Sequence, residues 1–361
     1  MEVTKHFYKS SESYAVPKGI VYHNVRENGN ISVFGLYNYR TEQTFKRMPT
    51  AVAETVNDRV RHLHTNPAGG RVRFKTDSKK LAIKAEYPRL TPRSILTAQA
   101  SMGFDIYLRK DGVFTFHTAL YPPIDMTDGY EKCMHLGEGE HEVEIYMPLY
   151  NDLDSMYIGI EEGATLEAAA PYTHSVPILY YGSSITQGAS ASRPGNAYSA
   201  IVERRLDADF INLGFASGAL GEKAMADYIA SLSFSAFVCD YDYNAPSAEH
   251  LEATHFPLYQ TIRASHPDTP ILLITKPILL AYSDNADNDR RRRIIYETYR
   301  RAEAAGDRNI YLLDGKEMFA PYEAGMACAD GVHPGDFGMW VMAENIVRVL
   351  KNALGRKEMG K

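Results

Sequence analysis

Hydrophobic and polar residues alternate with a period of two in the first half of the chain. Residues 71–76 place apolar side chains on one strand face and basic ones on the other, and residues 142–146 do the same with acidic ones. Turn signals such as Asn66-Pro67 and Asp111-Gly112 separate such runs, and helical stretches are few. This pattern predicts an all-β domain over residues 1–168, built as a β-sandwich or jelly roll.

The pattern changes at Ile178, where short buried runs begin to alternate with amphipathic stretches. Five strands are expected, at 178–181, 210–213, 236–241, 271–275 and 310–313. Helices are expected around 196–206, 221–231, 247–265, 287–304 and 335–353. Near-continuous apolar strands separated by helices favour a five-stranded parallel sheet covered on both faces. We therefore predict a second, α/β domain over residues 177–361, after a proline-containing boundary at 168–177.

Composition excludes several classes of protein. The 361 residues are 45% hydrophobic and 23% charged, as in ordinary folded proteins, and no apolar run is long enough to span a membrane. The net charge of −6 argues against a nucleic-acid partner. Three cysteines and an N-terminal stretch without an apolar segment favour a reduced, cytoplasmic protein without a disulfide framework. A homo-oligomer is left open.

Chemically useful residues follow four of the strands expected in the second half. Ser184 follows the first strand, Ser217-Gly218 the second and Asn244 the third, while Asp330 and His333 precede the last helix. Ligands of open α/β sheets bind outside the carboxyl ends of the strands, so these loops should converge. Together they supply a nucleophile, oxyanion donors, a base and an acid that orients the base.

The sequence blocks that carry these residues resemble those of the SGNH, or GDSL-type, hydrolases. The resemblance covers 177–361, with GSSIT, NLGFASG, DYDYNAP and DGVHP standing in the family's order. Residues 103–107, GFDIY, also resemble the G-x-D-L-Y signature of a β-sandwich that precedes some of these esterases. The resemblance implies a flavodoxin-like, three-layer catalytic domain. It also implies a serine esterase that removes acyl groups, most often acetyl, from carbohydrates or oligosaccharides.

The resemblance assigns a role to each of these residues. Ser184 would be the nucleophile, His333 the base and Asp330 its partner, with no metal or cofactor. The oxyanion would be held by the N–H groups of Ser184 and of Ser217 or Gly218, with a preference for Ser217, and by the Asn244 amide.

The chain departs from the family pattern at three places. In the second block, the family's oxyanion glycine falls on Ser217 when counted from Asn212, and on Gly218 when counted from the serine-glycine pair. Ser183 replaces an aspartate, which leaves two adjacent serines, and Asp242 replaces a glycine. Alignment on Gly182 and on Ile185-Thr186 favours Ser184 as the nucleophile.

Other residues admit weaker interpretations. Lys276 and Trp340 are candidate substrate-binding residues, although a solvated lysine and a core tryptophan are the simpler expectations. His250 and His255 are five residues apart and do not match a helical metal site. The run at 290–293 follows acidic residues and is expected to be a solvated helix start rather than a nucleic-acid patch.

Two other functions remain open. The chain could be a carbohydrate-binding protein with a decayed esterase domain, or it could hydrolyse lipid esters or thioesters.

Overall fold

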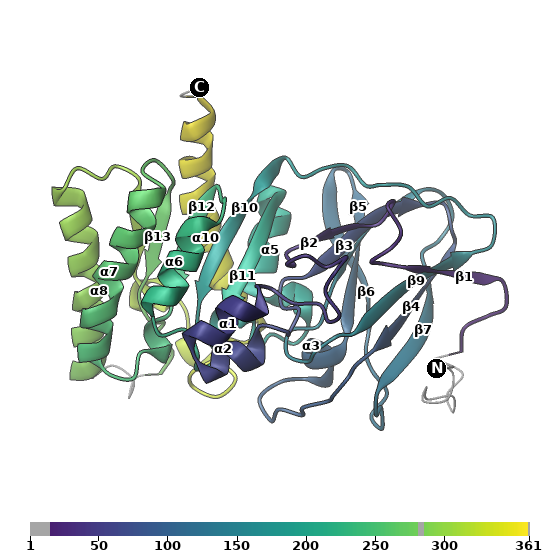
Figure 1. The fold of residues 1–361 in the computed structure, drawn as a ribbon, viewed down its shortest axis with the longest axis horizontal. Helices are drawn as coiled ribbons and strands as arrows, with labels where there is room; N and C mark the ends of the chain where they lie inside the picture. Colours follow the sequence, from purple (N-terminus) through teal and green to yellow (C-terminus); the bar gives the residue numbers. More distant parts are fainter. Residues whose placement is uncertain (1–14, 281–284, 360–361) are drawn as a thin grey trace. The chain divides into compact units, whose positions relative to one another are not determined.

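The computed structural model describes residues 15–280 and 285–359, and these form two compact units (Figure 1). Unit 1 contains the chain up to Met48, Thr65–Pro171 and Ser192–Gly195. Unit 2 contains Pro49–His64, Tyr172–Ala191 and the chain from Asn196. The N-terminal stretch examined for a signal segment lies outside the described residues. Among the described residues, none of the helices combines the length and the apolar character needed to cross a bilayer.

Unit 1 consists of two antiparallel sheets that share one apolar core. Its strands are β1 (Ile20–Asn24), β2 (Ser32–Phe34), β3 (Arg71–Thr76), β4 (Lys80–Glu86), β5 (Phe104–Lys110), β6 (Val113–Leu120), β7 (Gly129–His135), β8 (His141–Tyr146) and β9 (Ser155–Glu161). The strand orders are β1-β9-β4-β7 and β2-β3-β8-β5-β6. Apolar side chains of both sheets, including Phe74, Ile83 and Ile145, form one buried cluster. The prediction of a strand-rich N-terminal region is confirmed, although unit 1 also contains one short helix, α3 (Ala98–Met102).

The charged faces of β3 and β8 explain the alternation seen in their sequences. Arg73 stands opposite Glu144 in the register of the two strands, and its Nε donates to Glu144 Oε1 at 2.7 Å. Both side chains are fully buried. The basic face of one strand is therefore neutralised by the acidic face of its neighbour inside the protein, where an unpaired charge would be costly.

Unit 2 is built on a parallel sheet. Its strands are β10 (His174–Gly182), β11 (Ala208–Gly214), β12 (Ala236–Asp240), β13 (Ile271–Ile274) and β14 (Ile310–Leu313). The order is β11-β10-β12-β13-β14 and every neighbouring pair is parallel. Buried residues such as Leu179, Val238 and Leu272 fill the strands, as the apolar runs indicate. The predicted five-stranded parallel sheet is confirmed.

Two groups of helices cover this sheet. The helices are α4 (Ser184–Gln187), α5 (Tyr198–Leu206), α6 (Lys223–Ser231), α7 (Ala248–Ser265), α8 (Ala286–Ala304), α9 (Gly315–Phe319) and α10 (Asp336–Met359). Short 3-10 turns are η3 (Pro194–Asn196), η4 (Asp242–Asn244) and η6 (Ala324–Ala327). Helices α6, α7 and α8 pack side by side, and α5 packs with α10 (Figure 1). The unit therefore has three layers.

A helical hairpin from the first half of the sequence belongs to unit 2. It comprises α1 (Thr50–Val56) and α2 (Asp58–Leu63), and α1 packs on α6. Asn57 joins the two helices, and its Oδ1 accepts from the Val60 N–H at 2.9 Å as the N-cap of α2. The domain boundary predicted at 168–177 assigns this helical hairpin to the N-terminal β domain. The structure instead assigns it to unit 2, the α/β unit.

Candidate active site

Ser184 lies where β10 ends and α4 begins. A side chain at Gly182 would place its Cβ 2.0 Å from Thr186 Oγ1 and 2.4 Å from the Asp240 carbonyl oxygen, so the turn requires glycine. Ser183 is fully buried and its Oγ accepts from the Ile185 N–H at 3.2 Å, which caps α4. Of the two adjacent serines, Ser183 therefore has a structural role and Ser184 is the one presented outward.

A relay of hydrogen bonds joins Ser184, His333 and Asp330. Ser184 Oγ lies 2.9 Å from His333 Nε2, and His333 Nδ1 lies 2.8 Å from Asp330 Oδ2. The other oxygen of Asp330 accepts from the N–H groups of Val332 and His333, at 3.0 and 2.8 Å. This arrangement orients the imidazole with its Nε2 toward the serine, as a general base requires.

The same contacts set the charge of Asp330. Partial burial by itself raises the pKa of this carboxyl. Hydrogen bonds from the backbone and ring of His333 and from Val332 outweigh that effect and hold the pKa below its ordinary value. Asp330 is therefore ionised at neutral pH, and it can stabilise the imidazolium that forms when His333 takes a proton.

The turn after β11 distinguishes Ser217 from Gly218. The Gly218 N–H donates to the Phe215 carbonyl at 2.9 Å and is thus engaged within the turn. Ser217 is exposed and has a φ of 57°, a left-handed conformation that non-glycine residues adopt at some energetic cost. In the part of the chain that the structure describes, the Ser217 N–H donates no hydrogen bond. A role of the Ser217 N–H in the oxyanion site stays a prediction.

Asn244 is tied to the same turn. Its Nδ2 donates to the Phe215 carbonyl at 2.7 Å, which uses one of the two amide hydrogens. The Phe215 N–H donates to the Gly182 carbonyl at 2.9 Å. Hydrogen bonds thus connect the loops after β10, β11 and β12, and these loops carry Ser184, Ser217 and Asn244.

Asp242, which replaces a glycine of the family pattern, anchors the loop that carries Asn244. Burial raises the pKa of Asp242, opposed by the Lys276 N–H and by the charge of Arg291. Its Oδ2 accepts from the Lys276 N–H at 3.1 Å, and Arg291 Nη1 lies 3.5 Å from its Oδ1. The aspartate at position 242 therefore adds a buried ion pair with Arg291 next to the loop that carries Asn244.

The two candidate substrate-binding residues have different surroundings. Lys276 Nζ donates to Asn288 Oδ1 at 2.9 Å and lies 4.4 Å from the centre of the Tyr243 ring. Trp340 is 39% exposed and stacks on Phe337, so the expected core position is wrong. A role of either residue in substrate binding stays a prediction.

His250 and His255 have partners of their own inside unit 2. His250 Nε2 lies 2.7 Å from the Leu220 carbonyl oxygen, and the buried His255 lies 2.8 Å from Thr298 Oγ1. Burial lowers the pKa of His255 to about 3, so this ring is neutral. In the part of the chain that the structure describes, no group of three or more His, Cys, Asp or Glu side chains is arranged to hold a metal ion.

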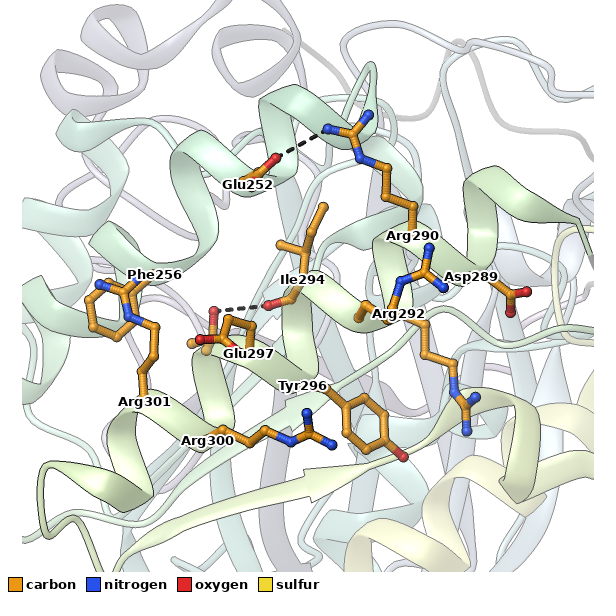
Figure 2. A pocket seen from close by; sticks show the side chains of 12 residues that line it. Glu252, Phe256, Asp289, Arg290, Arg292, Ile294, Tyr296, Glu297, Arg300 and Arg301 are labelled. Atoms are coloured by element: carbon orange, nitrogen blue, oxygen red, sulfur yellow. Dashed lines mark hydrogen bonds and ion pairs between the residues drawn. The ribbon is translucent and has the colours of Figure 1, made fainter.

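Residues of α7 and α8 line a hollow of about 790 Å³ (Figure 2). Several arginines of α8 surround it, and Arg290 pairs with Glu249 and Glu252 on α7. Acidic residues of both helices therefore offset much of the charge of the arginine run. The hollow includes none of the residues of the hydrogen-bonded relay.

Comparisons with known proteins identify the family of this chain. The model of the GDSL-like lipase/acylhydrolase family matches residues 175–351. The model of the N-terminus of SGNH-hydrolase-type esterases, named for its GxDLY motif, matches residues 20–166. A solved structure from Bacteroides ovatus, described as a GDSL-like lipase, is 30% identical with a TM-score of 0.82, and the match covers 92% of this chain and 98% of that one. The chain belongs to the GDSL-like lipase/acylhydrolase family.

More distant structures share the fold of this GDSL-like chain. The salicylyl-acyltransferase SsfX3 of a tetracycline biosynthetic pathway is 22% identical with a TM-score of 0.74, over 94% of this chain and 99% of that one. A family two carbohydrate esterase from Clostridium thermocellum is 16% identical with a TM-score of 0.60, over 80% and 93%. No curated protein matches the chain.

One element near the candidate site of this GDSL-like chain was missed from the sequence. Asn57, between α1 and α2, donates through Nδ2 to the Gly218 carbonyl at 2.9 Å and also bonds Glu222. It therefore supports the turn that carries Ser217. The helical run that starts at Thr50 and the Asn57-Asp58 pair, a helix-start signal, could have revealed the hairpin. The contacts of Asn57 with Gly218 and Glu222, which lie 161 and 165 positions further along the chain, could not be read from the sequence.

Proposed function

We propose that the chain is a serine esterase that removes O-acetyl groups from carbohydrates or oligosaccharides. Membership of the family establishes the broader activity class, that of an acyl-ester hydrolase. The observation that carries the serine mechanism is the relay of 2.9 and 2.8 Å contacts from Ser184 through His333 to Asp330. The carbohydrate esterase named among the fold neighbours supports a carbohydrate substrate.

The mechanism proceeds through two acyl-transfer steps. Ser184 Oγ attacks the acyl carbon while His333 Nε2 accepts the serine proton, and Asp330 stabilises the resulting imidazolium. The tetrahedral intermediate collapses, and His333 passes the proton to the departing sugar oxygen, which leaves as a free hydroxyl. Water then attacks the acyl-enzyme while His333 accepts its proton, and collapse of the second intermediate releases acetate as His333 returns that proton to Ser184 Oγ.

Three donors stabilise the negative oxygen of each intermediate. They are the Ser184 N–H at the start of α4, the Ser217 N–H and the second amide hydrogen of Asn244. Each such donor is typically worth about 2.7–4 kcal/mol of transition-state stabilisation.

Unit 1 is proposed to act as an accessory domain that binds glycan or shapes substrate access.

A reducing, cytoplasmic setting is consistent with the cysteines: Cys133, Cys239 and Cys328 are all free thiols.

Acetate release from a panel of acetylated xylo- and manno-oligosaccharides tests this proposal. Wild type should release acetate at a rate unchanged by EDTA, whereas Ser184→Ala should be inactive with an unchanged circular dichroism spectrum. Glycan binding without turnover would instead support the decayed-esterase alternative. Preferential cleavage of long-chain acyl-CoA would support a lipid or thioester hydrolase.

A further inference from the structure

Side chains of unit 1 bind a short segment, residues 192–195, that follows the nucleophile in the sequence. We call Asp105 and Tyr107, which bind this segment, the clamp. Residues 192–195 belong to that unit, although the chain on both sides of them belongs to unit 2. Asp105 on β5 is fully buried, and its Oδ2 accepts from Arg193 Nη1 at 2.9 Å and from the Gly195 N–H at 2.8 Å. Gln99 Nε2 donates to its other oxygen at 3.2 Å. A single carboxylate thus binds both the side chain and the backbone of the segment.

Tyr107 completes the clamp. Its hydroxyl accepts from the same Arg193 Nη1 at 2.8 Å, and the guanidinium lies 3.8 Å from the centre of the Phe116 ring. A Cβ at Gly195 would lie 2.6 Å from the Tyr107 hydroxyl and 2.9 Å from Asp105 Oδ2, so close approach requires glycine. The Asp and the Tyr of the motif at 103–107 therefore hold one short segment.

An ion pair between Asp105 and Arg193 joins the clamp to the segment. Burial raises the pKa of Asp105, and the charge of Arg193 and the donors from Gly195, Arg193 and Gln99 oppose that rise. Arg193 keeps 21% of its side chain exposed while Asp105 has none. Loss of either partner would leave a buried charge or a buried polar group without its counterpart.

Both ends of the clamped segment connect to the nucleophile turn. At the near end, the N–H groups of Gly188 and Ala189 donate to the Ser184 carbonyl, at 3.1 and 2.8 Å. At the far end, the buried Tyr198 hydroxyl donates to Thr186 Oγ1 at 3.0 Å. The backbone that carries Ser184 is therefore bonded to chain on either side of residues 192–195.

We propose that Asp105 is a positioning residue for acyl transfer. By fixing residues 192–195, it holds the loop from Gly188 to Tyr198 and thereby the Ser184 backbone in the geometry needed for attack. This inference rests on the proposed function, since it deepens the account of that same serine. Asp105 touches neither Ser184 nor His333 in the contacts described, so its effect must pass through the loop.

The test compares Asp105→Asn and the milder Tyr107→Phe with wild type on p-nitrophenyl acetate. Glu142→Gln is the matched control. Glu142 on β8 pairs at 3.3 Å with Arg109, which lies on β5 like Asp105 but outside the clamp. Misplacement of a reacting group by about 1 Å can cost about 10²-fold in rate. We expect a fall in kcat of about that size for Asp105→Asn, a smaller fall for Tyr107→Phe, and KM within about threefold throughout.

Amide hydrogen exchange provides the second readout. In Asp105→Asn, exchange at Gly188 and Ala189 should be faster than in wild type, whereas Glu142→Gln should leave it unchanged. The proposal is overturned if kcat for folded Asp105→Asn matches that of the control, or if exchange at these two amides does not change. Absence of ester turnover in wild type would overturn the proposed function instead, and the exchange measurement would still decide whether the clamp positions the loop.

Discussion

Replacement of Asn244 by alanine probes the proposed oxyanion site most sharply. The substitution removes the side-chain amide and leaves Ser184, His333 and Asp330 in place. One amide hydrogen of Asn244 holds the Phe215 carbonyl at 2.7 Å, and the other is the proposed donor to the reacting oxygen. The variant therefore loses one structural hydrogen bond and one hydrogen bond of the transition state.

These two losses have different sizes. Removal of one oxyanion donor costs about 10²–10³-fold in kcat, or about 2.7–4 kcal/mol. Loss of the bond to Phe215 should lower the free energy of unfolding by only about 0.5–1.5 kcal/mol. The activity should therefore fall far more than the stability, and KM should change little because the donor acts mainly on the charged intermediate.

The assay measures kcat and KM on p-nitrophenyl acetate together with unfolding in urea. Asn345→Ala is the control. The Asn345 side chain donates to the Val341 carbonyl at 2.9 Å within α10, so this substitution removes a comparable hydrogen bond elsewhere in the protein. The control should retain wild-type kcat. A kcat for Asn244→Ala within threefold of wild type would refute the assignment of this amide to the oxyanion site.

Three further substitutions test the surrounding structure. Asp330→Asn should lower kcat by about 10³–10⁴-fold, because the imidazole loses its anionic partner. The amide oxygen of the new side chain can still accept the hydrogen bonds from the loop N–H groups, so the fold should survive. Steady-state kinetics with a folding check would contradict the account if kcat fell only slightly. Ser217→Gly should keep activity within about threefold and gain up to about 1 kcal/mol of stability, because glycine suits the left-handed φ; a large loss of activity would mean that the hydroxyl, not the N–H, is used. Burial raises the pKa of Asp240 well above 3.8, so its contribution to stability falls as pH rises from about 4 to its folded pKa, by up to about 1.4 kcal/mol per pH unit. Asp240→Asn should remove that slope, and urea unfolding at a series of pH values would contradict the account if the stability difference between the two proteins did not change with pH.

The sheet and the order of its blocks could be predicted from the sequence because they depend on local pattern. Buried runs such as 178–181 contain little but apolar residues, and Ser184 and His333 follow recognisable elements. The family models then matched both halves, at 20–166 and 175–351. Local periodicity and short motifs therefore carry most of the fold and name the candidate residues.

Features set by long-range contacts could not be predicted. The choice between Ser217 and Gly218 depends on which N–H the Phe215 carbonyl engages, which is a property of the folded turn. Asn57 supports that turn across a sequence separation of 161 residues. Similarly, nothing local to residues 192–195 indicates that Asp105 binds them. Trp340, on the helix after His333, was expected to pack in the core, yet its side chain is 39% exposed.

The central claim, that Ser184 is the nucleophile, can be tested by covalent labelling. A fluorophosphonate reacts with an activated serine, and peptide mass spectrometry identifies the modified residue. We expect one adduct per chain on Ser184, none in Ser184→Ala and much slower labelling in His333→Ala. An adduct on Ser183, or no adduct on correctly folded wild type, would contradict the account.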